Sequence, residues 1–201
     1  MEKREFLDLV RSREYQISSI EKCACQIHAD VNQKYDKDLP YGFHLRLAAS
    51  YLTKYGYLEI EDASEIDTLY AAVYFHDSME DARMTYNDVM STFEELNMTY
   101  GCDIHVVDAA EMVYALTNDK GRTRSERAGE AYYAGIRNTP HAPFLKMCDR
   151  LANVRFTTLM YVEHHMAYVY KSEMDHFLDS ITKGAKTGVP QAMIDELTGM
   201  L

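Results

Sequence analysis

Residues 69–81, LYAAVYFHDSMED, decide the predicted fold. The first seven are apolar without interruption, which predicts a buried helix. Residues four apart on a helix share a face, so we expect His76 to lie above Glu80 and Asp77 above Asp81. Three carboxylates and an imidazole against a buried helix are costly to desolvate without a compensating cation, which favours a metal site. The alternative interpretation is a charged, solvated helix end.

The rest of the chain predicts a single helical domain. Of its 201 residues, 47% are hydrophobic and 26% are charged, which suits one globular domain with a sizeable core over residues 1–201. Apolar residues recur at helical spacing, and only four prolines interrupt the pattern, so we expect an all-α bundle. No internal repeat, low-complexity segment or linker divides the chain.

The expected helix boundaries follow from this spacing and from capping residues. Thr85 and Asp88 have the spacing of a capping box, and Gly101 is a natural helix end. The predicted helices cover 5–34 as one or two helices, 41–56, a helix carrying residues 69–81, 85–100, 103–116, 125–137, 145–155, 160–182 and a short helix opened by Pro190.

Charge and cysteine usage exclude several classes of protein. A formal net charge of -11 argues against a general nucleic-acid binder, which needs a basic surface. No apolar run is long enough for a membrane span, and the first residues lack the apolar core of a signal peptide. The four cysteines have no CxxC spacing and are typical of reduced thiols in a cytoplasmic protein. The apolar residues after Pro190 can pack either on the rest of the domain or on a second subunit, so a homo-oligomer is one alternative.

Further candidate metal ligands lie on other predicted helices. His44 opens one helix, although a lone histidine there is more often structural, and Asp149 lies in an apolar segment where it needs a partner. With His76 and Asp77 they can hold one divalent ion and leave positions open for water. Mixed nitrogen and oxygen ligands with open positions suit manganese or iron, with zinc also open. Such a site lowers the pKa of bound water and supplies hydroxide near neutral pH.

The densest basic cluster of this acidic chain begins in a polar loop over residues 117–124. Lys120, Arg122, Arg124 and Arg127 follow one another closely there. The functional interpretation is a grip on substrate phosphate. The alternative is the ordinary surface of a helix N-terminus.

The order of one His, a His-Asp pair and a later Asp resembles the HD phosphohydrolase superfamily. Residues 76–81, HDSMED, match the HDxxED motif of RelA/SpoT homologue hydrolases. Residues 145–155, LKMCDRLANVR, resemble that family's VKLADRLxNxR segment, and residues 40–44, PYGFH, resemble its PYxxH segment. Residues 117–120, TNDK, lie where the family has a Thr-Asp-Asp-Lys-like loop. The likeness spans about residues 17–160, which leaves 161–201 as a C-terminal helical extension.

The resemblance implies a small, stand-alone, manganese-dependent hydrolase with an HD-domain helical bundle. The implied substrate is guanosine tetra- or pentaphosphate, from which the 3'-diphosphate leaves as pyrophosphate. Carried over residue by residue, the metal ligands are His44, His76, Asp77 and Asp149. The water-activating pair is Glu80 and Asp81. The nucleotide contacts are Lys34, Lys120 and Asn153.

The sequence departs from the family pattern at three positions, which concern base recognition more than metal binding. Gln33 replaces a frequent Arg, Leu45 a usual Pro and Ala82 a usual Thr. Gln33 favours a second hypothesis, the same chemistry on another nucleotide such as a phosphorylated nicotinamide dinucleotide. A third hypothesis is a metal-binding regulatory module without turnover, against which the intact pair of Glu80 and Asp81 argues.

Overall fold

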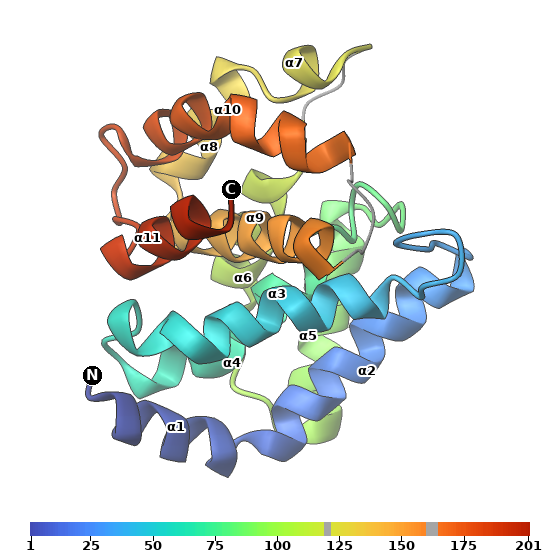
Figure 1. The fold of residues 1–201 in the computed structure, drawn as a ribbon. Coiled ribbons are helices and arrows are strands. Elements are labelled where there is room, and N and C mark those ends of the chain that lie inside the picture. The colour runs from blue at the N-terminus through green and yellow to red at the C-terminus, as the bar shows by residue number, and fades with distance from the viewer. Residues whose placement is uncertain (119–121, 160–164) are drawn as a thin grey trace.

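A computed structural model describes residues 1–118, 122–159 and 165–201, which form an all-α bundle as predicted (Figure 1). The described residues contain no β-strand, only an isolated antiparallel bridge between Lys34 and Pro40. The helices are α1 Lys3–Ser12, α2 Glu14–Asp30, α3 Gly42–Tyr55, α4 Ile66–Phe75, α5 Tyr86–Tyr100, α6 Val106–Leu116, α7 Arg124–Arg127, α8 Glu130–Asn138, α9 Ala142–Leu159, α10 His165–Thr182 and α11 Gln191–Met200, with 3-10 turns at Gly56–Leu58 and Ala63–Glu65.

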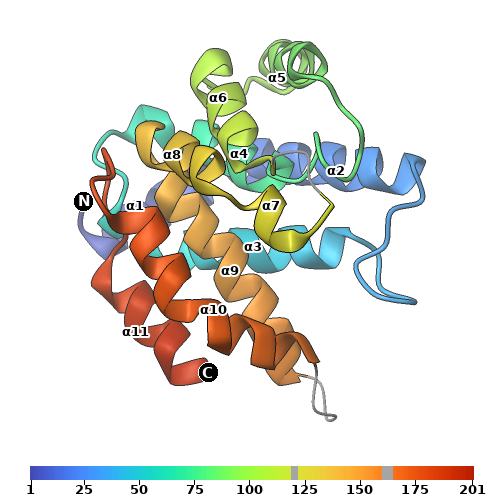
Figure 2. The same cartoon turned by 90° about the horizontal axis from the view of Figure 1, so that it is seen from above.

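Helix α4 is the centre of the core. All ten of its residues are buried, and they include the apolar run 69–75 that was predicted to form a buried helix. It packs against α2, α3 and α6, while α9 packs against α3, α4, α10 and α11. Figure 1 shows α9 between α3 below and α10 above, and Figure 2 shows α5 and α6 on the side away from α11. The C-terminal end of α4 therefore meets α3 and α9 inside the bundle.

Local capping explains several of the observed boundaries. The Thr85 side chain accepts from the Asp88 backbone N–H while the Asp88 carboxylate accepts from the Thr85 N–H, so the predicted capping box is confirmed. Gly101 ends α5 with φ +65°, a left-handed conformation that glycine adopts without strain. The predicted helix over 125–137 is instead two helices, because the chain is extended at Gly129 (φ -83°, ψ -176°).

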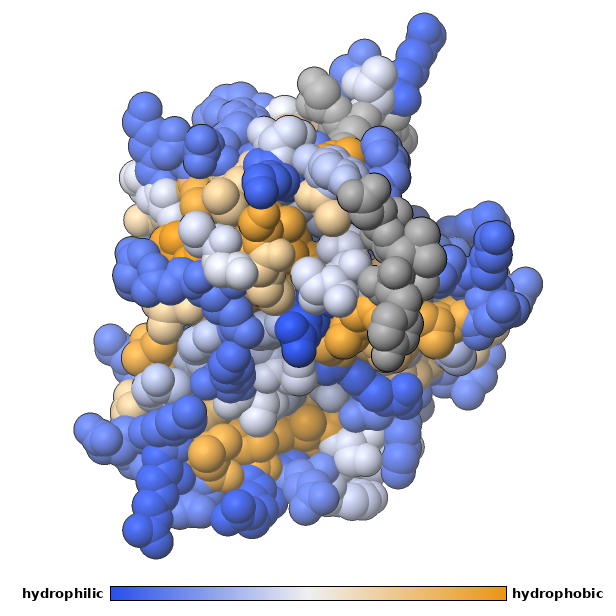
Figure 3. Space-filling view, in the orientation of Figure 1, coloured by the Kyte–Doolittle hydropathy of each residue, from blue (hydrophilic) through white to orange (hydrophobic). Residues whose placement is uncertain are grey.

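Polar residues cover most of the face shown in the space-filling view, with apolar residues in separate patches (Figure 3). The large apolar side chains that are fully buried come from most parts of the chain, which gives one contiguous core. Among the described residues, no helix has the length and apolar character needed to cross a membrane.

A buried ion pair joins the N-terminal helices to the core. The Asp67 carboxylate is 1% exposed and accepts from Arg13, which lies at the break between α1 and α2. Asp67 also accepts from the Asp103 backbone N–H at 2.8 Å, and Arg13 donates to the Gly101 carbonyl at 3.2 Å. One carboxylate on α4 therefore fixes both the start of α2 and the loop between α5 and α6.

Replacing Arg13 by methionine is expected to lower the free energy of unfolding by about 3 kcal/mol, because it leaves the buried Asp67 carboxylate without its cation. This is the lower end of the range for buried pairs, since the Arg13 side chain is 26% exposed. Urea unfolding measures the loss. The matched control is Arg11→Met, which breaks an exposed pair with Asp8 and should cost less than about 1 kcal/mol. Equal losses in the two variants would contradict this role for the buried pair.

Candidate metal centre

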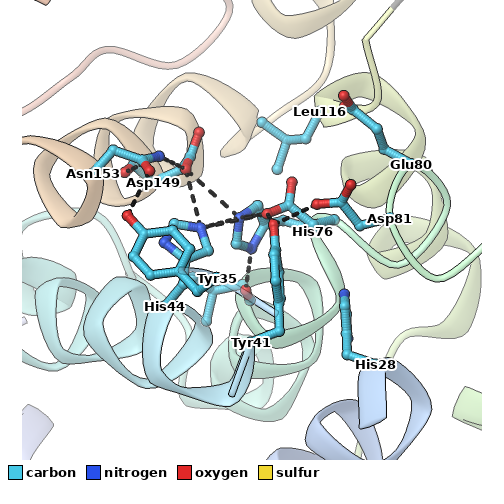
Figure 4. A network of polar contacts seen from close by, with 12 residues as sticks. His28, Tyr35, Tyr41, His44, His76, Glu80, Asp81, Leu116, Asp149 and Asn153 are labelled. Carbon is cyan, nitrogen blue, oxygen red and sulfur yellow. Dashed lines mark hydrogen bonds and ion pairs between the residues drawn. The ribbon is translucent and has the colours of Figure 1, made fainter. Parts of the chain in front are cut away.

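Three elements bring the four predicted metal ligands together. His44 lies in the first turn of α3, His76 and Asp77 follow the last residue of α4, and Asp149 lies in the middle of α9. His44, His76 and Asp149 are buried and Asp77 is partly exposed. Figure 4 shows the four side chains converging from these separate helices. The packing of α3, α4 and α9 around the core is what produces this convergence.

The candidate ligand atoms lie at distances close to those between groups around a single ion, with one pair shorter and one longer. The Nε2 atoms of His44 and His76 are 3.1 Å apart, and the Oδ2 atom of Asp77 lies 3.4 Å and 2.8 Å from them. The Oδ1 atom of Asp149 lies 3.3 Å and 3.7 Å from the same two nitrogens. Ligands roughly 2.1 Å from one ion are about 3.0 to 3.4 Å from their neighbours. The His44, His76 and Asp77 group could hold a metal ion, with Asp149 adjoining it through the histidines.

The two imidazoles are oriented with Nε2 toward this centre. His76 Nδ1 lies 2.7 Å from the carbonyl oxygen of Val73, which can only accept, so Nδ1 carries hydrogen and Nε2 of the neutral ring keeps its lone pair. A carbonyl that fixes the tautomer in this way is the usual outer partner of a metal-binding histidine. The His44 ring stacks on Tyr35, with ring centroids 4.8 Å apart.

The electrostatics of the centre favour positive charge. Burial by itself lowers the pKa of His76, but the charge of Asp77 and hydrogen bonding to Asp77 and Asp149 outweigh it and raise that pKa well above its usual value. Burial would raise the pKa of both carboxyl groups, yet Lys146 and the histidines hold the pKa of Asp149 well below its usual range. The pKa of Asp77 is lowered in the same way, chiefly by His76. A divalent cation at this position would be stabilised by the same two carboxylates.

The HDxxED segment continues α4 only as turns, so the predicted helix through Asp81 is wrong. Helix α4 ends at Phe75, and the Ser78 N–H donates to the Phe75 carbonyl three residues back at 2.8 Å, which tightens the chain. The Asp81 N–H still donates to the Asp77 carbonyl at 2.8 Å. Asp77 and Asp81 therefore share one side as predicted, while Glu80 is directed away from His76.

A single tyrosine links the candidate ligand Asp77 to the candidate base Asp81. The Tyr41 hydroxyl lies 2.6 Å from an oxygen of each carboxylate, so its one hydrogen is shared between two acceptors. Burial raises the pKa of Asp81, and the nearby charge of Asp77 adds to that rise. Glu80 is exposed and accepts from the Asn118 side chain at 2.8 Å. Of the predicted catalytic pair, only Asp81 is joined to the centre through Tyr41.

The centre opens into a cavity of about 740 Å³. This volume lies within the range of small-molecule sites. A smaller cavity of about 400 Å³ between α4, α6 and the turn before α9 contains none of the candidate ligands. The larger cavity is bounded by the candidate metal centre on one side and by α7, α8 and α10 on the other. Its lining includes His44, Asp77, Glu80, Asp81, Asp149 and Asn153 from the sequence prediction.

Of the three predicted nucleotide contacts, one lines the cavity, one does not, and one lies outside the described residues. Asn153 lines the cavity and donates to the Asp149 carboxylate at 2.5 Å. Lys34 is exposed on the loop between α2 and α3 and is not part of the cavity lining. Lys120 lies outside the described residues. Arg127, from the same predicted basic cluster, is exposed and lines the cavity.

Several site residues were not predicted. Lys146 donates to the Asp149 carboxylate at 2.8 Å, and its position three residues earlier on the same helix face could have indicated it. Tyr35 donates to the Asn153 side chain at 2.8 Å, from a loop more than a hundred residues away. The Arg150 guanidinium lies 4.2 Å from the ring centroid of Phe177 on α10, a contact that no local spacing could reveal.

No protein-family model matches this sequence, and no curated protein matches it either.

Proposed function

We propose that this protein is a metal-dependent phosphohydrolase acting on a phosphorylated nucleotide, with guanosine tetra- or pentaphosphate as the first candidate substrate and pyrophosphate as the released product. The observation that carries the proposal is the convergence of His44, His76, Asp77 and Asp149 next to a cavity, whose lining includes three of these residues and also Asp81. The same residues carry the resemblance to the RelA/SpoT homologue hydrolases, which supports the same conclusion.

The donor set fits a divalent cation with mixed nitrogen and oxygen ligands. Because Nδ1 of His76 donates to the Val73 carbonyl, Nε2 is the nitrogen that would bind a cation in place of a proton, and the two carboxylates supply the negative charge that offsets the cation. Manganese is the first candidate, and iron or zinc would accept the same ligands. When bound, such an ion lowers the pKa of a coordinated water and withdraws charge from phosphoryl oxygens.

In this proposal Asp81 accepts the proton of the attacking water. It lies on the cavity wall beside the ligand Asp77, and the shared Tyr41 hydroxyl fixes its position. The raised pKa of Asp81, caused mainly by burial, improves its basicity relative to an exposed carboxylate. Glu80 lies at the exposed rim, where its bond to Asn118 orients it toward the loop that follows α6.

The cavity has cationic side chains that suit the phosphate groups of a nucleotide. Lys146 donates to Asp149 on one side of the cavity, and Arg127 adds an exposed cation on the opposite side. Phosphate groups can pair with such cations. Tyr132 and Phe177 line the cavity from α8 and α10, but both side chains are buried in the core.

A second candidate is the same chemistry on another nucleotide, such as a phosphorylated nicotinamide dinucleotide. The observation that favours it is the position of Lys34, which is exposed away from the cavity lining, next to Gln33 where the family often has arginine. The base contacts implied by the resemblance are therefore weakened at both positions, whereas the chain has the expected residue type at all four positions that the resemblance assigns to metal ligands.

A turnover screen with manganese tests the proposal. Guanosine tetraphosphate, a phosphorylated nicotinamide dinucleotide and ordinary nucleoside triphosphates are compared, with the released pyrophosphate and orthophosphate measured separately. We expect manganese-dependent release from one of the first two and loss of turnover after chelation. Orthophosphate release from the dinucleotide would select the second candidate. Absence of turnover on all substrates with manganese, iron or zinc would support the regulatory module instead.

A further inference from the structure

His28 stacks on Tyr41 next to the candidate centre and is not one of the predicted site residues. It is on α2, and its side chain is completely buried. Its ring is parallel to that of Tyr41, with an interplanar angle of 2° and centroids 4.6 Å apart. Figure 4 shows the His28 ring edge directed toward the side of Tyr41 on which Asp81 lies. The side chain thus supports the residue that joins Asp77 to Asp81.

The tautomer of His28 is fixed by the backbone. Nδ1 lies 2.9 Å from the Ala24 carbonyl oxygen, which can only accept, so Nδ1 carries the hydrogen. Burial lowers the pKa of His28, which keeps the ring neutral near pH 7. Nε2 is then a hydrogen-bond acceptor with its lone pair directed into the protein. Within the described residues this buried nitrogen has no partner.

Stacking alone does not account for a histidine at this position. A phenylalanine would provide the same flat surface behind Tyr41 without an unpaired polar atom, which is costly to bury. The other buried polar atoms without partners in the described part of the chain are His44 Nδ1 and Ser78 Oγ, both in or next to the centre. Asp77 and Asp81 are the carboxylates whose charges act on His28. The unpaired acceptor thus belongs to the surroundings of the centre.

We propose that His28 is a positioning residue for Asp81. Its ring holds Tyr41 in place, and its Nε2 accepts a hydrogen bond from a donor, such as a water molecule, that is shared with the Asp81 carboxylate. Helix α2 would then set the direction in which Asp81 faces the cavity. The part of this inference that concerns turnover rests on the proposed phosphohydrolase function, whereas the part that concerns geometry does not.

Three variants distinguish the flat surface of the His28 ring from its two nitrogen atoms. His28→Phe keeps the flat surface and removes both nitrogens, His28→Asn keeps only a donor to Ala24, and His28→Gln places a polar atom near the Nε2 position. We expect His28→Phe and His28→Asn to lower kcat about 10- to 100-fold, as loss of an outer partner does, with KM and manganese affinity unchanged. His28→Gln should recover part of the loss. Parent kcat in His28→Phe, or no recovery in His28→Gln, would overturn the proposal.

A spectroscopic measurement on the full chain keeps this test independent of turnover. Nitrogen-15 spectra of the histidine rings should show hydrogen on Nδ1 of His28, and the ring carbon-13 shift of Tyr41 should change in His28→Phe more than in His28→Gln. Hydrogen on Nε2, or a Tyr41 signal that is the same in all variants, would overturn the role of His28. A parent protein without turnover on any nucleotide would overturn the proposed function while leaving these two readouts to decide the inference.

Discussion

Replacement of Asp81 by asparagine is expected to lower nucleotide turnover by roughly 100- to 10,000-fold, the range that general base catalysis contributes. The amide has the shape of the carboxylate and can still accept from Tyr41, which lies 2.6 Å away, but it cannot take a proton. Because Asp81 is joined to the centre through Tyr41 and is not one of the four candidate ligands, bound metal should be retained. Product release under saturating substrate measures kcat, and elemental analysis of the same sample measures metal.

Two further variants make the Asp81 result specific. Glu80→Gln removes the other carboxylate of the motif, which is exposed and bonded to Asn118, and we expect a smaller loss than in Asp81→Asn. Asp108→Asn removes an exposed carboxylate on α6 outside the larger cavity and controls for the change in net charge. Turnover near the parent rate in Asp81→Asn would exclude Asp81 as the proton acceptor. Loss of all metal in that variant would make Asp81 a ligand.

The helical architecture could be predicted because its signals are local. The buried α4 follows from an uninterrupted apolar run, and the start of α5 follows from the capping box of Thr85 and Asp88. The end of α4 at Phe75 could not be predicted, because the tight turn from Ser78 back to Phe75 has no clear signature in a segment whose residues all tolerate a helix. The break at Gly129 could not be predicted either, because an isolated glycine is compatible with both a helix and a break.

The candidate site could be predicted only where residue type carries the signal. His44, His76, Asp77 and Asp149 attract attention because imidazoles and carboxylates in apolar segments require partners, and the fold does bring them together. Tyrosines carry no such signal, because a tyrosine in a core is ordinary. Tyr35 and Tyr41 acquire their roles from contacts with side chains 118 and 36 residues away in the sequence. The α10 wall of the cavity is likewise set by long-range packing against α8 and α9.

Substitution of Asp149 by alanine is expected to reduce manganese affinity by roughly 100-fold or more, because even partners outside the ligand set cost about 10- to 100-fold. Two effects add in this variant. A carboxylate ligand is lost, and Lys146, whose ammonium is 2.8 Å from that carboxylate, is left as an unpaired cation beside the centre and repels the incoming ion. Calorimetric titration of metal-stripped protein with manganese measures the affinity, and circular dichroism of the same sample checks that the helices are retained.

A double variant separates the two effects. Asp149→Ala with Lys146→Met removes the ligand and the repelling charge together, so it should bind manganese more tightly than Asp149→Ala alone and more weakly than the parent. Asn153→Ala removes the amide that donates to Asp149 while leaving all four ligands, and it should lose only the 10- to 100-fold typical of an outer partner. Unchanged stoichiometry and affinity in Asp149→Ala would remove Asp149 from the ligand set. The candidate centre would then contain only His44, His76 and Asp77.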